Sequence, residues 1–194
     1  PYPKYGVAHN AWDALDVVKD VGYPVLVRPS YVLGGQRMRI VINDQELEES
    51  VISLLKALPD NQILIDHFLD RAVEAEIDAI SDGKDIHILG IMQHIEPCGI
   101  HSGDSNSVLP PYSISEDCID TMIEYTHRLA KAIDIIGLIN VQFAIKDEKV
   151  YVIEANPRAS RTVPFIAKAY DIPYVNYATK VMLGQLAVKS IKVS

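Results

Sequence analysis

Three side chains in the C-terminal half carry oxygen atoms at a spacing that suits a metal ion. Gln142 and Glu154 stand on either side of a predicted tight turn, and Asn156 follows Glu154 by two positions. If the strands pair about Glu148, Gln142 and Glu154 face each other and Asn156 shares their face. Magnesium prefers such hard oxygen ligands and takes the rest from phosphate and water. A register shift of one residue would turn Gln142 to the other face, so a polar patch on a solvated hairpin is the alternative interpretation.

Two arginines follow this set directly in the chain. Arg158 and Arg161 come just after Asn156. Because a guanidinium group matches the planar geometry of a carboxylate, paired arginines beside a metal site would hold a small planar anion. The alternative is a pair of surface arginines at a helix start, but the neighbouring oxygen ligands favour the anion site.

A second candidate anion site lies in the N-terminal part of the chain. Arg28 ends a short apolar strand, and Gly34 and Gly35 end the loop that follows it. Glycines let backbone N–H groups approach phosphate closely, and an arginine at a strand end supplies a fixed cation. The spacing matches neither GxxxxGK[ST] nor GxGxxG, so a hairpin turn with an incidental arginine is the alternative.

A long loop over residues 97–111 concentrates small polar residues, including the run HSGDS that starts at His101. Loops of this length inside compact domains are usually functional. A hydrolase triad is rejected, because it needs convergence from a scaffold and the chain has no GxSxG turn. His101 is instead predicted to bind a ligand or to hydrogen-bond within the loop. His87 and His94 fall at an odd spacing on one strand, which predicts opposite faces and no zinc cluster.

The elements that would position these residues begin with a first segment of helices and strands. Helical spacing of apolar residues predicts a helix over 11–21 and a second, capped by Asp44, to about residue 55. Short apolar runs predict strands over 25–27, 38–42 and 63–65. Together these elements predict a small βαβ-like lobe.

The second segment begins with a strand over 73–79 in which apolar and acidic residues alternate, so one face is apolar and the other acidic. Ser113 and Glu116 resemble a capping box for a helix that runs to about residue 133. Further strands are predicted over 86–95, 138–145 and 150–153, the last two as a hairpin, and further helices near 164–170 and 174–183.

Composition bounds the class of protein. The 194 residues carry a net charge of −8 and 48% apolar residues, which excludes disorder and argues against nonspecific nucleic-acid binding. A local basic pocket for an anion stays compatible with that charge. No apolar run is long enough to span a bilayer, and no signal peptide opens the chain. Cys98 and Cys118 are the only cysteines, which predicts a reducing compartment. The start at Pro1 without Met suggests a segment of a longer protein.

Several motifs in order resemble the large subunit of carbamoyl phosphate synthetase. They are RPSYVLGG at 28–35, LIDHFL at 64–69, GIM at 90–92 with HSGDS at 101–105, NVQFA at 140–144 and IEANPRASRTVP at 153–164. The resemblance extends from about residue 17 to 186. The large subunit of that family contains two similar ATP-grasp halves, and the YVLGG and HSGDS runs resemble the C-terminal half.

The resemblance implies an α+β ATP-grasp fold, in which two lobes with mainly antiparallel sheets clasp ATP between them. It implies a small lid lobe over 1–70, truncated at its N-terminus, and a larger lobe over 71–194 with metal and carbamate sites. The implied activity is ATP-dependent phosphorylation of carbamate to carbamoyl phosphate, a step in pyrimidine and arginine biosynthesis. The alternatives are another ATP-grasp carboxylate–amine ligase, a biotin carboxylase-like enzyme, or a nucleotide-binding module that is inactive as an isolated segment.

The resemblance also assigns roles to residues and implies partners. The implied cofactors are ATP and Mg²⁺ or Mn²⁺, with K⁺ as a further candidate ion. The implied partners are the remainder of the large subunit and a glutaminase small subunit, with carbamate as substrate and with no nucleic acid or membrane. The implied compartment is the cytoplasm, or the mitochondrion for a eukaryotic urea-cycle enzyme. The implied site residues are Arg28, Gly34 and Gly35 on the phosphates, His67 and Leu69 near adenine, Glu74 on the ribose, Gly99, Ile100, His101 and Ser102 lining the nucleotide pocket, Gln142 and Glu154 on both nucleotide and metal, Asn156 on the metal, and Arg158 and Arg161 as catalytic residues that hold carbamate.

Overall fold

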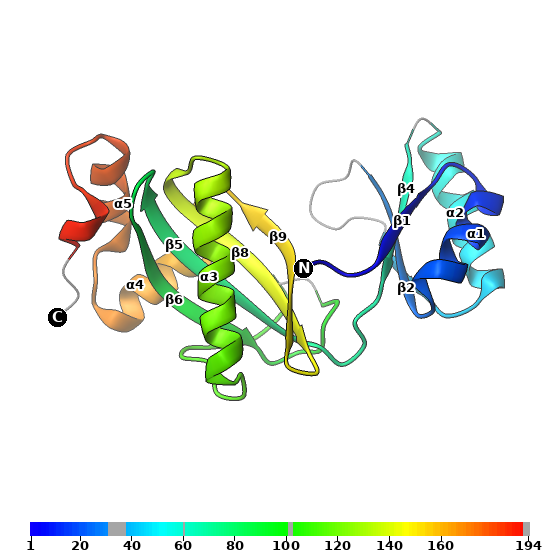
Figure 1. Cartoon of the computed structure of the whole chain (residues 1–194), viewed down its shortest axis with the longest axis horizontal. Coiled ribbons are helices and arrows are strands. Elements are labelled where there is room, and N and C mark those ends of the chain that lie inside the picture. The colour runs from blue at the N-terminus through cyan, green and yellow to red at the C-terminus, as the bar shows by residue number, and fades with distance from the viewer. Residues whose placement is uncertain (31–37, 60, 101–102, 192–194) are drawn as a thin grey trace. The chain divides into compact units, whose positions relative to one another are not determined.

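The computed structural model describes residues 1–30, 38–59, 61–100 and 103–191. The chain divides into two compact units, a small unit of residues 2–70 and a large unit of residues 71–194 that also includes Pro1 (Figure 1). Each unit has its own antiparallel sheet and its own core. Four residues assigned to the nucleotide by resemblance lie outside the described residues: Gly34, Gly35, His101 and Ser102.

The small unit places two helices on one face of a four-stranded sheet of order β1-β4-β2-β3. Strands β1 and β2 both run antiparallel to β4, which lies between them. The expected βαβ-like lobe is present in split form, because α1 connects β1 to the parallel β2 and α2 connects β3 to the parallel β4, each pair with one strand between its members. Strand β1 was not expected from the sequence. The elements are β1 (Tyr5–Ala8), α1 (Ala11–Val21), β2 (Val25–Pro29), β3 (Arg39–Val41), α2 (Asp44–Ala57) and β4 (Ile63–His67).

Local sequence explains where the helices of the small unit begin and end. The Asn10 side chain accepts a hydrogen bond from the Asp13 N–H and caps α1, and Gly22 ends that helix at φ 81°. Helix α2 is capped by Asn43 and not by Asp44, because the Asn43 side chain accepts from the Glu46 N–H. The apolar stripes of both helices are buried against the strands in one core.

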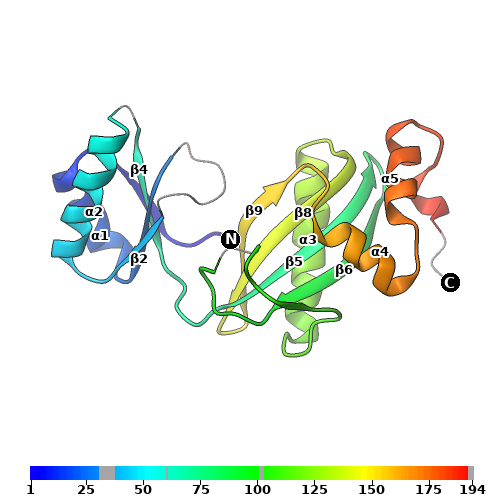
Figure 2. The ribbon, with the colours of Figure 1, turned by 180° about the vertical axis from the view of Figure 1, so that it is seen from behind.

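The large unit is built on a five-stranded antiparallel sheet of order β7-β6-β5-β8-β9. Helix α3 packs on one face, whereas α4 and α5 pack on the other (Figure 2). Among the described residues, no helix is both long enough and apolar enough to cross a membrane. The elements are β5 (Val73–Asp82), β6 (Ile86–His94), β7 (Ser107–Val108), α3 (Glu116–Ala132), β8 (Ile136–Lys146), β9 (Lys149–Asn156), α4 (Thr162–Tyr170), α5 (Tyr174–Met182) and the 3₁₀ turn η1 (Val188–Ser190).

Helix α3 begins later than its expected capping box. Ser115 is the N-cap, and its side chain accepts a hydrogen bond from the Cys118 N–H. Ser113 serves a different purpose, because its Oγ accepts from Gln93 Nε2 at 2.6 Å. The capping box predicted from Ser113 is therefore wrong, and Ser113 ties the approach to α3 to strand β6.

Strand β5 lies in the middle of the sheet, between β6 and β8. Its apolar residues belong to the core beneath α3. Its acidic residues point to the opposite face, yet Glu76 and Asp78 are only 4% and 1% exposed. The alternating pattern therefore has two buried faces, and the acidic one must satisfy its charges inside the protein.

A β-bulge in the β8–β9 hairpin sets which side chains share a face. Asp147 and Glu148 form the turn with φ 50° and 56°, as a two-residue type I′ hairpin turn requires. From that turn the pairing runs regularly to Phe143 opposite Val152, and then shifts so that Gln142 lies opposite Glu154. The residue left over in β9, Ile153, is the bulge.

A second bulge lies in strand β6. Ala79 pairs with Ile88 and Asp78 pairs with Gly90, which leaves Leu89 as the extra residue. The bulge reverses the alternation between the two ends of β6. His87 pairs with Ile80, and His94 contacts Glu74 and Glu76, which share the face of Ile80. The expectation that His87 and His94 face opposite sides is therefore wrong.

Candidate active site

The β8–β9 hairpin carries a row of oxygen-bearing side chains on the face away from α3. Gln142 pairs with Glu154, and Asn140 pairs with Asn156 two residues further along the strands. Asn156 Nδ2 donates a hydrogen bond to Glu154 Oε1 at 2.8 Å. Glu154 is exposed, Gln142 and Asn156 are half-buried, and Asn140 is buried. The structure thus contains the expected pairing, and we call Gln142, Glu154 and Asn156 the oxygen row.

The chemistry of the oxygen row fits a nucleotide-bound magnesium ion better than a structural metal. It offers one carboxylate and two amide groups. Within residues 1–30, 38–59, 61–100 and 103–191, no group of three or more His, Cys, Asp or Glu side chains gathers to hold a metal. A hard cation on the row would therefore complete its ligand shell with phosphate and water oxygens, as magnesium commonly does.

The two arginines lie directly beyond the oxygen row. The Arg158 N–H donates to the Asn156 carbonyl at 2.8 Å, and Arg158 Nη1 donates to the Ala159 carbonyl at 3.2 Å. Arg161 occupies the N-cap position of α4, and its charge is among the influences that lower the pKa of Glu76. Both arginines are exposed. The structure therefore brings the predicted arginines to the end of the strand that carries Glu154 and Asn156.

A buried histidine lies between two carboxylates on the same sheet. His94 is 4% exposed, with Nδ1 3.3 Å from Glu74 Oε2 and Nε2 3.4 Å from Glu76 Oε1. Burial alone would lower the pKa of His94, but the two carboxylates outweigh it and raise the pKa to about 9. Burial would likewise raise the pKa of each carboxyl, but the bond to His94 leads the contacts that lower it. At neutral pH the ring is an imidazolium between two carboxylates.

Glu74 also holds the start of the long loop. The Gly99 N–H donates to Glu74 Oε1 at 3.1 Å, so two residues assigned to the nucleotide by resemblance are in contact. Burial, followed by the charge of Glu74, raises the pKa of the neighbouring Cys98 thiol to about 12. Cys98 is therefore a neutral thiol and not a nucleophile. Ile100 is 44% exposed beside this contact.

Asp78 is the centre of a buried hydrogen-bond cluster that the sequence does not predict. It accepts from Ser160 Oγ at 2.6 Å and from Thr162 Oγ1. Asn140 Nδ2 donates to Glu76 Oε2 at 2.8 Å and to Asp78 Oδ1 at 3.3 Å. Burial raises the pKa of Asp78 to about 6, despite the hydroxyl bonds that lower it. The sequence signal for this cluster is the acidic face of β5. That signal does not reveal the cluster unless the segment that covers this face is known.

The small unit holds its candidate residues by separate contacts. Arg28 Nε donates to Asp66 Oδ2 at 2.7 Å, and the Arg28 side chain is 40% exposed. His67 Nδ1 lies 3.0 Å from the Gly22 carbonyl, and Leu69 is 8% exposed. Arg28 is thus a cation fixed on the sheet, and His67 is anchored to the chain that leaves α1.

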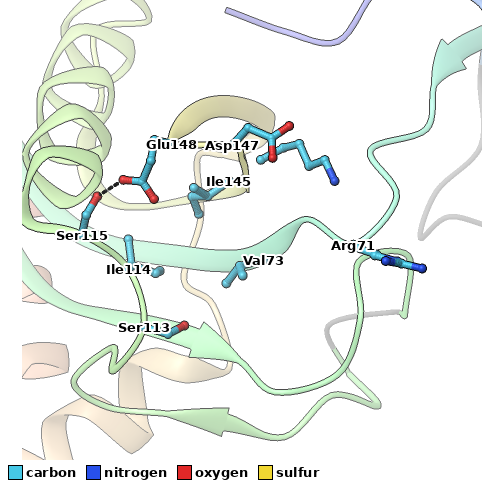
Figure 3. Close-up of a pocket in the computed structure, with 9 residues that line it drawn as sticks. Arg71, Val73, Ser113, Ile114, Ser115, Ile145, Asp147 and Glu148 are labelled. Atoms are coloured by element: carbon cyan, nitrogen blue, oxygen red, sulfur yellow. Dashed lines mark hydrogen bonds between the residues drawn. The ribbon is translucent and has the colours of Figure 1, made fainter.

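A cavity of about 300 Å³ lies elsewhere in the large unit, near the hairpin turn. Figure 3 shows Glu148 at one side of it, where its carboxylate accepts from Ser115 Oγ. The cavity is lined by Arg71, Val73, Ser113, Ile114, Ser115, Ile145, Lys146, Asp147 and Glu148. Among the described residues, none assigned to nucleotide, metal or carbamate by resemblance lines this cavity, and Gln142, Glu154 and Asn156 are not part of its lining.

Comparison with solved structures identifies the fold. The crystal structure of a biotin carboxylase–beta-gamma-ATP complex from Campylobacter jejuni matches with a TM-score of 0.81 and 22% identity, over 99% of this chain and 45% of that chain. The likeness at this low identity concerns the fold. The expected α+β ATP-grasp fold is confirmed.

Comparison of sequences identifies the family. The carbamoyl phosphate synthase large chain of Archaeoglobus fulgidus is 52% identical over 95% of this chain and 17% of that protein. The carbamoyl phosphate synthase large chain, C-terminal section, of Methanocaldococcus jannaschii is 50% identical over 99% of this chain and 31% of that protein. The chain thus spans a third or less of the length of these relatives. Residues 3–188 match the family described as carbamoyl-phosphate synthase L chain, ATP binding domain, and the chain belongs to that family.

Proposed function

We propose that this chain is the ATP-grasp unit of a carbamoyl phosphate synthase large chain and phosphorylates carbamate with ATP. The observation that carries the proposal is that the proposed metal ligands and the two arginines follow one another at the end of strand β9. Glu154 pairs with Gln142 near the end of β9, Asn156 is the last residue of that strand, and Arg158 and Arg161 follow it in the chain. Metal ligands and anion-binding groups next to each other are what transfer of a phosphoryl group to a small carboxylate-like acceptor requires.

Each unit, taken by itself, contains residues with a proposed role toward the nucleotide. We assign residues 1–70 as the small ATP-grasp lobe and residues 71–194 as the larger lobe with the metal and carbamate sites. Glu74 is suited to ribose hydroxyls, because its carboxylate stays ionised and already positions the Gly99 N–H. The other proposed contacts are those of Arg28, Gly34 and Gly35 with phosphate, of His67 and Leu69 with adenine, and of Gly99, Ile100, His101 and Ser102 along the nucleotide.

The oxygen row would hold Mg²⁺ through Gln142, Glu154 and Asn156, with Mn²⁺ and K⁺ as further candidate ions. When bound, such an ion supplies charge neutralisation for the phosphate oxygens. The hydrogen bond from Asn156 to Glu154 fixes the carboxylate in advance. Glu154 is exposed on its face, so its oxygens are accessible to a metal–nucleotide complex.

Arg158 and Arg161 would bind the two oxygens of carbamate. A carbamate oxygen then attacks the γ-phosphorus in line, the bond to the β-phosphate oxygen breaks, and ADP leaves. The guanidinium groups orient the attacking oxygen and offset charge on the transferring group. Positioning and charge account for this reaction, so no covalent enzyme intermediate is needed.

Two other functions are less well supported. A biotin carboxylase-like activity has only the fold in its favour, because that neighbour is 22% identical whereas the carbamoyl phosphate synthase chains are about half identical. The other function is a nucleotide-binding module without turnover, which the experiment below distinguishes from the proposed activity. The proposed partners are the remainder of a large chain and a glutaminase subunit, and the proposed compartment is the cytoplasm, or the mitochondrion in a eukaryotic urea-cycle enzyme.

The test runs the reaction backwards, because carbamate is labile. Purified protein receives ADP, MgCl₂ and carbamoyl phosphate, and ATP is measured with luciferase. We expect ATP that depends on carbamoyl phosphate, with no ATP when acetyl phosphate replaces it. Glu154→Gln should abolish the signal, and Glu124→Gln on the far-side helix α3 should retain it. Nucleotide binding without ATP formation would overturn the proposed activity and favour the module.

A further inference from the structure

Asp78 joins the central strand of the large unit to the segment that carries the arginines. Its side chain is 1% exposed. Both of its oxygens are used, since Oδ1 accepts from Ser160 and Oδ2 accepts from Thr162. These two hydroxyl residues flank Arg161. We call residues 158–162 the arginine segment.

The arginine segment is tightened further around the same carboxylate. Ser160 Oγ lies 2.6 Å from Thr162 Oγ1, and it accepts from the Thr162 and Val163 N–H groups at 3.2 and 3.3 Å. Ser160 therefore satisfies two N–H groups of the first turn of α4 while it donates to Asp78. A change at Asp78 would reach Arg161 through both of its flanking residues.

Helix α4 approaches the sheet closely beside Asp78. Gly90 is the residue paired with Asp78 on β6. A Cβ atom at Gly90 would lie 3.0 Å from Ile166 Cγ2 and 3.3 Å from Leu109 Cδ1. The missing side chain lets α4 lie near enough for Thr162 to reach Asp78. Asp78 and Gly90 together determine the distance between α4 and the sheet.

We propose that Asp78 is a positioning residue that fixes Arg158 and Arg161 for the acceptor anion by anchoring Ser160 and Thr162. The inference deepens the proposed function and rests on it. Both arginines are exposed, so burial of their own side chains does not hold them in place. The anchored backbone helps to place them, because misplacement of a binding group by about 1 Å costs on the order of 100-fold in rate.

The anchor serves the acceptor and not the nucleotide. Asp78 accepts directly from Ser160 and Thr162 in the arginine segment, whereas its connection to Glu74 runs only indirectly, through Asn140, Glu76 and His94. Loss of the anchor should therefore weaken use of carbamoyl phosphate and leave use of ADP almost unchanged. A residue that only stabilised the fold would weaken both.

A matched pair of variants at Thr162 tests the anchor while the Asp78 side chain itself stays unchanged. Thr162→Val keeps the shape and removes the hydroxyl, whereas Thr162→Ser keeps the hydroxyl and removes the methyl group. In the reverse assay, Thr162→Val should raise KM for carbamoyl phosphate about tenfold, the size of one hydrogen bond to a charged group. Thr162→Ser should stay within about twofold of the parent, and KM for ADP should be unchanged in both. Asp78→Asn should raise KM for carbamoyl phosphate by more than Thr162→Val does.

Hydrogen exchange of the backbone gives a readout that needs no turnover. Exchange in residues 158–163 should speed up in Thr162→Val and stay at the parent rate in Thr162→Ser. Equal behaviour of the two Thr162 variants in KM and exchange, or a parallel rise of both KM values, overturns the anchor. A parent protein without ATP formation overturns the proposed function instead, and the exchange rates of the two variants then decide the anchor on their own.

Discussion

Gln142 lies directly opposite Glu154 on neighbouring strands, and the bulge at Ile153 is what puts it there. The turn at Asp147 and Glu148 starts a register that would otherwise pair Gln142 with Ile153. Glu154 would then point toward α3, since a shift of one residue exchanges the two faces of a strand. The bulge absorbs the extra residue and turns the end of β9 so that its polar side chains join those of β8.

Lysine variants of Arg158 and Arg161 should separate the contribution of the positive charge from that of the planar guanidinium group. Replacing Arg158 or Arg161 by Lys keeps the charge but removes the planar pair of donors that matches a carboxylate. We expect KM for carbamoyl phosphate in the reverse assay to rise by about tenfold or more, with KM for ADP almost unchanged. Lys168→Met, which removes an exposed cation from helix α4, is the matched control. Similar KM values for parent and Lys variants would contradict bidentate binding.

The small unit depends on a glycine at a close approach between β1 and α1. A Cβ atom at Gly6 would lie 2.4 Å from Val17 Cγ1. Gly6→Ala should therefore lower the free energy of unfolding by about 1–3 kcal/mol. Adding Val17→Ala removes the clashing methyl groups, so the double variant should be more stable than the sum of the two single changes predicts. Urea denaturation of the parent, the two single variants and the double variant measures this. Strict additivity would show that contact with Val17 does not cause the destabilisation by Gly6→Ala.

Short-range patterns predict much of this fold, and long-range pairing explains what they miss. The β8–β9 hairpin is predictable because its turn and flanking strands are adjacent. Strand β1 escapes prediction because its side chains are mostly exposed and it pairs with the distant β4. The helix caps Asn43 and Ser115 lie near the expected Asp44 and Ser113, since several polar residues adjoin each helix start and local propensity does not choose among them.

The candidate site is predictable only where it is local. The oxygen row and the arginines follow each other along the chain and are apparent in the sequence. The Leu89 bulge depends on the partner strand β5, so simple alternation assigns His87 and His94 to the wrong faces. Asp78 stands in a visible acidic pattern, but its role depends on Thr162 in a helix far along the chain.

The buried imidazolium of His94 should make stability depend on pH. The pKa of His94 rises from 6.5 to about 9 on folding, and the charged groups that face it are Glu74 and Glu76. The folded protein then holds a proton that the unfolded chain releases, so this stabilisation is complete below pH 6.5 and is lost as pH rises through about 9. The loss can reach about 1.4 kcal/mol per pH unit.

Urea denaturation across that range, followed by circular dichroism, measures the effect. The free energy of unfolding of the parent should fall toward that of His94→Gln as the pH rises. A constant difference between the two proteins from pH 6.5 to about 9 would mean that His94 does not carry its charge in the folded state.

The most direct test of the account is the magnesium dependence of nucleotide binding at the oxygen row. Calorimetry compares ADP binding in excess MgCl₂ and in EDTA for the parent, for Glu154→Gln, and for Glu124→Gln, which is a control at an exposed position of α3. We predict that Mg²⁺ strengthens binding by about tenfold or more in the parent and the control, and that Glu154→Gln loses this gain. A Glu154→Gln protein that keeps the full magnesium-dependent gain would contradict the assignment of the oxygen row.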